Sequence, residues 1–144
     1  MKILFILLVF LVNFSQTSNA YFKLSKLVEL DDPWGASFLN DKELIITEKG
    51  GAIKILNLNS NNVKKIEHKL NILEHGQGGL LDILYKDNFI YVSYTESRGD
   101  WTSSTSIAKA KLNSKELKFK NIFQAEPPID LSLIHISEPT RLGA

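Results

Sequence analysis

The segment from His75 to Asp82 holds the residues of this chain that are best suited to contact a ligand. Its sequence, His-Gly-Gln-Gly-Gly-Leu-Leu-Asp, sets Gln77 among three glycines just before an apolar run. Glycines let the backbone approach a ligand closely, and the amide of Gln77 offers a donor and an acceptor to a hydroxyl or carbonyl oxygen. From these residues alone, however, a solvated turn with a spectator glutamine is the better interpretation.

The other polar residues that suggest chemistry are better explained structurally. A lone histidine in a glycine-rich turn, such as His75, is typical of a surface position and not of a catalytic base. Asp31 and Asp32 lack the spaced oxygen ligands that calcium requires. Trp34 follows a proline and is expected in the core or as a wedge between neighbouring units of the fold. Arg98-Gly99-Asp100 is interpreted as a chance tripeptide in a polar loop. No catalytic residue and no metal ligand is predicted.

The elements that would position these residues are short β-strands. No stretch shows helical periodicity of any length, whereas short runs with period-two alternation recur between turn residues. Lys49-Gly50-Gly51 predicts a tight hairpin turn, and the stretch from Thr95 to Ser104 a polar loop. The expected strands cover residues 36–39, 43–48, 52–58 and 63–66, and then 80–85, 88–94, 105–112 and 117–123.

These strands form two similar sets of four. Within the strand 105–112, Lys109 and Lys111 alternate with Ala108, Ala110 and Leu112, which predicts one polar and one apolar face. The second strands of the two sets are offset by about 46 residues, a spacing typical of β-propeller blades. A meander from a sandwich would alternate in the same way but need not repeat its turns.

Residues 21–130 are therefore predicted to be an all-β, incomplete β-propeller of about two four-stranded blades. Each blade buries its faces only against its neighbours, so two blades alone leave apolar faces in water. The isolated segment is expected to aggregate or to remain molten.

The N-terminus has the features of a secretory signal peptide. Residues 1–20 contain Lys2, ten apolar residues from Ile3 to Val12, and then Ser18-Asn19-Ala20, with small residues at the two positions that a signal peptidase reads. Cleavage is expected after Ala20. Ten apolar residues are too few to cross a hydrocarbon core of roughly 30 Å, so no membrane span is expected after cleavage. The expected location is periplasmic or secreted.

Composition excludes several other classes of protein and site. The chain has no cysteine, which rules out a disulfide framework and thiolate metal ligands. Its net charge of +1, with both signs interspersed, gives no basic stripe for nucleic acid.

The C-terminal residues 131–144 are expected to be non-native. The run from Leu131 to Arg141 is similar, residue for residue, to the translation of a transposase adapter used in preparing sequencing libraries. His135 falls in this run and receives no role. The alternative is a genuine C-terminal strand that packs Leu133, Ile134 and Ile136.

An ordered set of motifs across residues 27–128 resembles the start of the glucose/sorbosone dehydrogenase family. The most specific of them is the run from Gly76 to Asp82. The full set is Pro33-Trp34-Gly35, Thr47-Glu48 with its paired glycines, Gly76-Gln77-Gly78-Gly79-Leu80-Leu81-Asp82, Tyr91-Val92-Ser93-Tyr94 and Ile122-Phe123-Gln124-Ala125-Glu126-Pro127.

The resemblance implies a six-bladed propeller that binds pyrroloquinoline quinone (PQQ) and calcium and oxidises an aldose, passing electrons to an external acceptor. It implies that Gln77 lines the cofactor and sugar pocket. The family's catalytic histidine and the arginine after it would follow the position of Pro128, and the calcium ligands would come from later blades. None of these is present in residues 21–130, so this piece is expected to be inactive. The alternative is a propeller that binds a sugar or a protein without catalysis.

Overall fold

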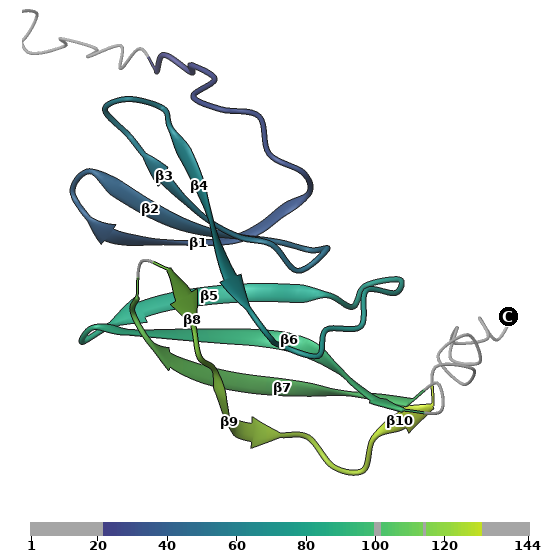
Figure 1. Ribbon diagram of the computed structural model, residues 1–144. Helices are drawn as coiled ribbons and strands as arrows, with labels where there is room; N and C mark the ends of the chain where they lie inside the picture. Colours follow the sequence, from purple (N-terminus) through teal and green to yellow (C-terminus); the bar gives the residue numbers. More distant parts are fainter. Residues whose placement is uncertain (1–21, 100–101, 114, 131–144) are drawn as a thin grey trace, which may run out of the picture.

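The computed structural model describes residues 22–99, 102–113 and 115–130, which form two stacked β-sheets (Figure 1). The first sheet contains β1 (Pro33–Asn40), β2 (Glu43–Glu48), β3 (Ile53–Asn57), β4 (Val63–His68) and β8 (Glu116–Leu117). The second sheet contains β5 (Leu80–Lys86), β6 (Phe89–Gly99), β7 (Thr102–Lys111), β9 (Lys120–Gln124) and β10 (Ile129–Asp130). Successive antiparallel pairs make each sheet a four-stranded meander, as expected from the two sets of sequence runs.

The core lies between the two sheets. Fully buried aliphatic side chains of the first sheet meet buried side chains of the second, and the predicted alternation in β7 is confirmed because Ala108 and Ala110 are buried while Lys111 is exposed. On the opposite face of the second sheet, the ammonium group of Lys109 lies 3.8 Å from the ring centroid of Phe89. The buried cluster comprises Ile45, Ile53, Ile66, Leu80, Ile83, Ile90, Val92, Tyr94, Ala108, Ala110 and Leu117.

The stretch from Thr95 to Ser104 is not the loop predicted from its polar composition. β6 continues to Gly99 and β7 begins at Thr102, with Thr95 paired to Thr105 and Glu96 to Ser104. The prediction failed because it relied on apolar residues to mark the strand. Here the period of two continues in serine, threonine and charged residues, whose backbone groups still complete the ladder.

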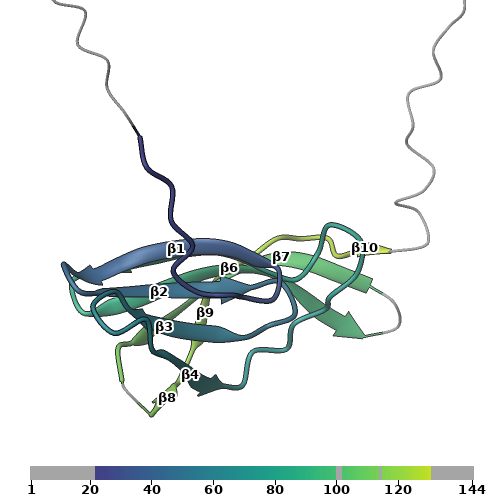
Figure 2. The ribbon, with the colours of Figure 1, turned by 90° about the horizontal axis from the view of Figure 1, so that it is seen from above.

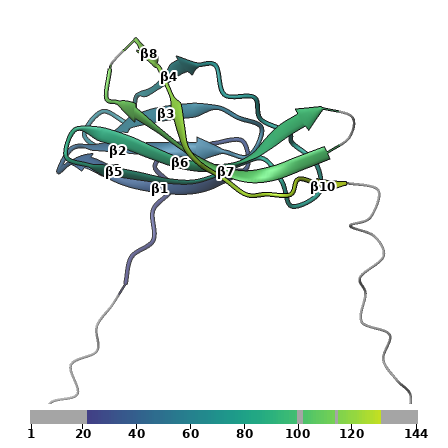
Figure 3. The same cartoon turned by 90° about the horizontal axis from the view of Figure 1, so that it is seen from below.

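The predicted fourth strand over residues 117–123 is divided between the two sheets. Leu117 belongs to β8, which pairs in parallel with the end of β4 and buries Leu117 in the core. Residues 120–124 then form β9, the true fourth strand of the second sheet. Figures 2 and 3 show β8 beside β4, away from β7 and β9. The connection after β7 thus covers the outer edge of the first sheet.

Close backbone contacts join the sheets near the start of β1. Thr47, which is fully buried, donates its hydroxyl hydrogen to the carbonyl oxygen of Leu81 and accepts the amide hydrogen of Gly35 across 3.0 Å. A Cβ atom on Gly35 would lie 2.8 Å from the Cα atom of Asp82, so only glycine fits there. Trp34, by contrast, is 42% exposed, so of its two expected positions the core of these sheets is excluded, while a wedge against a further blade stays a prediction. Its ring lies 5.6 Å from the ammonium group of Lys49.

Within the described residues, no helix is long and apolar enough to cross a bilayer. The predicted signal peptide, Ala20 included, and the predicted non-native tail with His135 lie outside these residues.

Candidate functional site

The loop that carries Gln77 lies at one end of the two sheets, which we call the site end. Antiparallel neighbours place every second connection at the same end. The β2–β3 turn, the segment 69–79 between β4 and β5, and the adjoining ends of β6 and β7 at Gly99 and Thr102 therefore meet there, with the end of β9 beside them. In Figure 1 this is the right-hand end of the molecule, where β10 also lies.

Gln77 occupies the tip of a tight turn at the site end. The amide of Gly78 donates to the carbonyl oxygen of His75 across 2.7 Å, which closes the turn. Both His75 and Gln77 are exposed, and for His75 this agrees with the surface position expected from the sequence. The Gln77 amide can therefore be reached by a ligand from solvent.

Backbone hydrogen bonds clamp this loop along the edge of β6. The amide of Leu73 donates to the carbonyl oxygen of Thr95 across 2.9 Å, and the amide of Thr95 donates to the carbonyl oxygen of Gly79 across 2.8 Å. Further along, the amide of Ser97 donates to the carbonyl oxygen of Asn71 across 3.0 Å. The Asn71 side chain returns a 2.8 Å hydrogen bond to the carbonyl oxygen of Ser97. The loop is thus an added edge of the second sheet and not a free connection.

Gly79 is one point at which the loop touches the end of the first sheet. A Cβ atom here would lie 2.5 Å from the carbonyl oxygen of Lys49, and φ is 156°. The following amide, of Leu80, donates to the same oxygen across 2.9 Å. This contact explains why the second residue of the pair Gly78-Gly79 is a glycine.

A polar cluster, which we call the Glu96 cluster, lies on the inner face of β6 next to this clamp. The Glu96 carboxylate accepts hydrogen bonds from the Ser106 hydroxyl at 2.6 Å and from the Gln124 amide at 2.7 Å. The Asn121 amide donates to both carboxylate oxygens at 3.0 and 3.1 Å. The Oδ1 atom of Asn121 in turn accepts the hydroxyl of Tyr94 at 2.8 Å. The cluster therefore links β6, β7 and β9.

The surroundings of Glu96 and Tyr94 shift both pKa values. Burial by itself raises the pKa of Glu96, but hydrogen bonds from Ser106, Gln124 and Asn121, with the positive charge of Arg98, hold it below its ordinary value. Burial raises the pKa of Tyr94, and the nearby negative charge of Glu96 adds to the rise against the hydrogen bond to Asn121. Glu96 is therefore an anion at neutral pH and acts as an acceptor, not as a proton donor.

Arg98 has structural partners at the site end. Its guanidinium group donates to the Ser104 hydroxyl at 3.3 Å and forms an ion pair with Glu126 just beyond β9. An arginine so engaged supports the interpretation of Arg98-Gly99-Asp100 as a chance tripeptide. Asp100 itself lies outside the described residues.

The sequence offered a signal for the Glu96 cluster that was not used. Glu96 and Arg98 continue the period-two series of Ile90, Val92 and Tyr94 along β6, and so they share its inner face. The polar composition of the stretch led to a loop prediction and concealed this periodicity.

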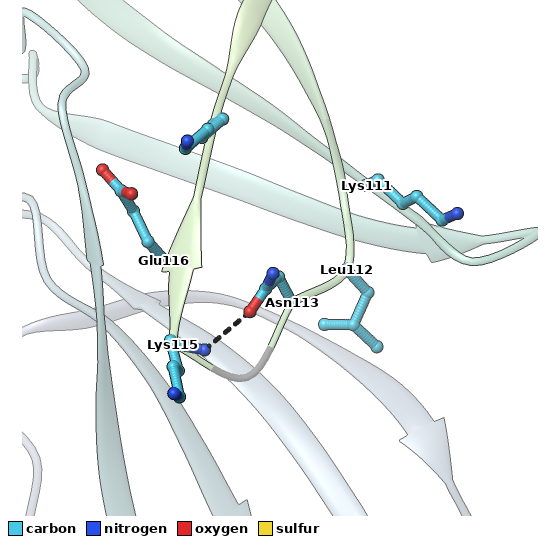
Figure 4. Close-up of a pocket in the computed structure, with 6 residues that line it drawn as sticks. Lys111, Leu112, Asn113, Lys115 and Glu116 are labelled. Atoms are coloured by element: carbon cyan, nitrogen blue, oxygen red, sulfur yellow. Dashed lines mark hydrogen bonds between the residues drawn. The ribbon is translucent and has the colours of Figure 1, made fainter.

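Within the ranges that the structure describes, no group of three or more His, Asp or Glu residues is arranged to hold a metal ion. Asp32, just before β1, accepts a 3.3 Å hydrogen bond from the indole nitrogen of Trp34. An open hollow of about 440 Å³ lies at the end of the sheets opposite Gln77. Its lining residues include Lys111 and Glu116, whose side chains point away from each other, so they do not converge on a ligand (Figure 4).

Comparison with known proteins now adds to this geometry. Residues 30–136 match the family model described as glucose/sorbosone dehydrogenase. The matched range includes the Gln77 loop, both sheets and the Glu96 cluster. The chain belongs to the glucose/sorbosone dehydrogenase family. The resemblance stated from the sequence motifs is thus confirmed.

Among the similar proteins, two solved structures confirm that the two sheets are β-propeller blades. The aldose sugar dehydrogenase YliI of Escherichia coli (strain K12) is 29% identical over 110 residues, which are 70% of this chain and 30% of that protein. A solved glucose dehydrogenase is similar with a TM-score of 0.66 and 26% identity, over 73% of this chain and 33% of its own. A PQQ-bound aldose sugar dehydrogenase from Streptomyces coelicolor has the same fold, with a TM-score of 0.61 and 19% identity over 69% of this chain and 32% of its own.

This family member spans about a third of the length of these relatives. Its two sheets therefore correspond to part of a larger propeller.

Proposed function

We propose that this chain is the N-terminal part of an exported, PQQ-dependent dehydrogenase that oxidises an aldose and passes electrons to an external acceptor. The family match across residues 30–136, which includes the Gln77 loop, carries the proposal. Two relatives are named as aldose sugar dehydrogenases, and one of these is PQQ-bound. A periplasmic or secreted location follows from the predicted signal peptide in residues 1–20 and belongs to the same proposal.

The site end fits one part of a site for such a cofactor. Gln77 is exposed at the tip of a turn whose base is held by hydrogen bonds to Thr95 and Lys49, so the backbone that carries its side chain has a defined position. When bound, PQQ supplies the hydride acceptor for oxidation of the sugar carbon. Gln77 would donate its amide hydrogen to a quinone or sugar oxygen and would orient the two partners.

The remaining parts of the site are proposed to lie beyond the described residues. We assign no catalytic base and no calcium ligand to residues 22–130, so the 144-residue chain is proposed to be inactive by itself. The outer face of the second sheet agrees with a larger fold, because Leu84, Phe123 and Ile129 are each more than half exposed. A further blade packed there would cover them. Residues 131–144 are proposed to replace native sequence.

The test begins with overlapping genomic reads that extend the reading frame beyond residue 130. The full-length product, supplied with PQQ and calcium, is expected to reduce an artificial electron acceptor when an aldose is added. The 144-residue chain is expected neither to reduce the acceptor nor to unfold cooperatively. A full-length propeller that binds sugar without any turnover would contradict the proposal and support the non-catalytic alternative.

The role of Gln77 is tested in the same full-length protein. Gln77→Ala is expected to lower kcat/KM by roughly tenfold, the value of one lost hydrogen bond to a polar ligand. Asn59→Ala, an exposed amide at the opposite end of the first sheet, serves as the matched control. Unchanged kcat/KM in Gln77→Ala would remove the proposed contact.

A further inference from the structure

The Glu96 cluster lies next to the Gln77 loop but takes no part in the proposed chemistry. We propose that Glu96 is a positioning residue, which fixes the segment of β6 that holds the loop and thereby sets the position of Gln77. The inference rests on the proposed function, because it gives Gln77 a ligand to contact.

The first step is the reach of Glu96 across β7. Its carboxylate contacts Gln124 and Asn121 on β9, although β7 lies between β6 and β9 in the sheet. Neighbouring strands are roughly 4.8 Å apart, so a side chain crosses a strand only where the residues between are small. On the inner face of β7 these residues are Ser104 and Ser106, and Ser106 adds a hydrogen bond of its own.

The second step is the alternation of backbone groups along β6. Thr95 and Ser97 direct their amide and carbonyl groups toward the loop, through the hydrogen bonds to Leu73, Gly79 and Asn71. Glu96 stands between them, and its side chain is held on the core side by β7 and β9. Movement of Glu96 would therefore displace both anchor points of the loop together.

The third step is the match between the carboxylate and its partners. An ionised carboxylate only accepts hydrogen bonds and has room for about four, while Ser106, Asn121 and Gln124 all donate to it. Removal of the carboxylate leaves these donors without an acceptor and breaks the links from Glu96 to β9, so that within the cluster the hydrogen bond from Tyr94 to Asn121 alone still joins β6 to β9. Glutamine at this position restores one acceptor oxygen, and the Gln124 amide can rotate to accept from its nitrogen.

Amide hydrogen exchange in the full-length protein tests this positioning without reference to activity. Glu96→Ala is expected to accelerate exchange in residues 71–79 by roughly tenfold, and Glu96→Gln by much less. The matched control is Glu43→Ala, because Glu43 accepts a 2.9 Å hydrogen bond from Asn40 at the opposite end of the first sheet. The control should leave exchange in residues 71–79 unchanged.

A kinetic cycle with Gln77 separates positioning from general destabilisation. If Glu96 acts through Gln77, Glu96→Ala lowers kcat/KM in the parent protein but has little further effect in Gln77→Ala. Full additivity of the two losses would overturn the proposal. If Gln77→Ala is itself without effect, the proposed ligand contact fails, while the exchange experiment still decides whether Glu96 holds the loop.

Unchanged exchange in residues 71–79 of Glu96→Ala would overturn the inference whatever the activity. Should Glu96→Ala not fold, Glu96→Gln carries the test. The amide exchange rate in residues 71–79 of this variant should then exceed the rates in the parent protein and in Glu43→Ala by about threefold, because its hydrogen bonds are weakened but not lost. Equal rates in the three proteins would reject the positioning role.

Discussion

The two hairpins that end at the site end, β2–β3 in the first sheet and β6–β7 in the second, hold their carboxylates differently. β2 and β3 have 6 and 5 residues, whereas β6 and β7 have 11 and 10. In the short hairpin, Glu48 pairs with the ammonium group of Lys54 at 2.6 Å and accepts the amide of Asp31 at 2.7 Å. In the long hairpin, Glu96 accepts from one hydroxyl and two side-chain amides.

This difference separates the hairpin that supports the proposed Gln77 site from the hairpin that serves as scaffold. The Glu48 pair joins β2 to β3 and to the segment before β1, so its side-chain contacts lie within that end of the first sheet. The Glu96 cluster joins β6, β7 and β9, and the extra length of β6 gives the Gln77 loop an edge to pair with. Extension of the second hairpin turns a connection between blades into an ordered loop.

The largest expected effect comes from breaking the contact between the loop and the short hairpin. Gly79→Ala would place a methyl group 2.5 Å from the Lys49 carbonyl oxygen, and backbone must move to relieve the clash. We expect a loss of about 2–4 kcal/mol in the free energy of unfolding, measured by denaturant titration of the full-length protein. Gly50→Ala is the control, because its Cβ atom would meet only the flexible Glu74 side chain, at 3.3 Å. Equal losses of unfolding free energy in the two variants would show that the loop does not pack closely against the Lys49 carbonyl group.

A smaller loss is expected from removing the carboxylate of the short hairpin. Glu48→Ala leaves the half-buried Lys54 ammonium without its partner, which should cost about 1–2 kcal/mol once partial solvation is allowed for. The comparison predicts that exchange in residues 71–79 changes less than it does in Glu96→Ala. Lys65→Ala removes an exposed 3.5 Å pair with Glu67 and should be nearly neutral. A larger acceleration of the loop in Glu48→Ala would reverse the proposed division of roles.

The smallest effect is a dependence on pH. The folded-state pKa of Glu96 lies below its ordinary value of 4.5, so its ionisation stabilises the fold above that value. This contribution is lost as the pH falls through the folded-state pKa, with Arg98 and Tyr94 as the neighbouring titratable groups. The difference in Tm between the parent protein and Glu96→Gln should therefore be constant near neutrality and shrink in acid. A difference that grows in acid would contradict the shift.

The predicted strands were mostly correct because apolar alternation marks the buried face of each blade. β2 was predicted at its observed bounds, 43–48, and the turn at Lys49-Gly50-Gly51 was found in place. The error at residues 95–104 arose because β6 and β7 continue there in polar residues, whereas the error at residues 117–123 arose because a neighbouring element decides burial. Leu117 is buried by β4, which lies about fifty residues earlier in the chain, and periodicity within a run does not reveal such a partner.

The sequence by itself determined the all-β class, the two-blade repeat, the family and the glycine-framed position of Gln77. These depend on local chemistry, on period-two alternation and on an ordered set of motifs. The tertiary structure alone decided that Glu96 would meet Asn121 and Gln124, which are 25 and 28 residues away. Such a contact requires β6, β7 and β9 to pair in register, and register is set by the packing of the whole sheet against its neighbour.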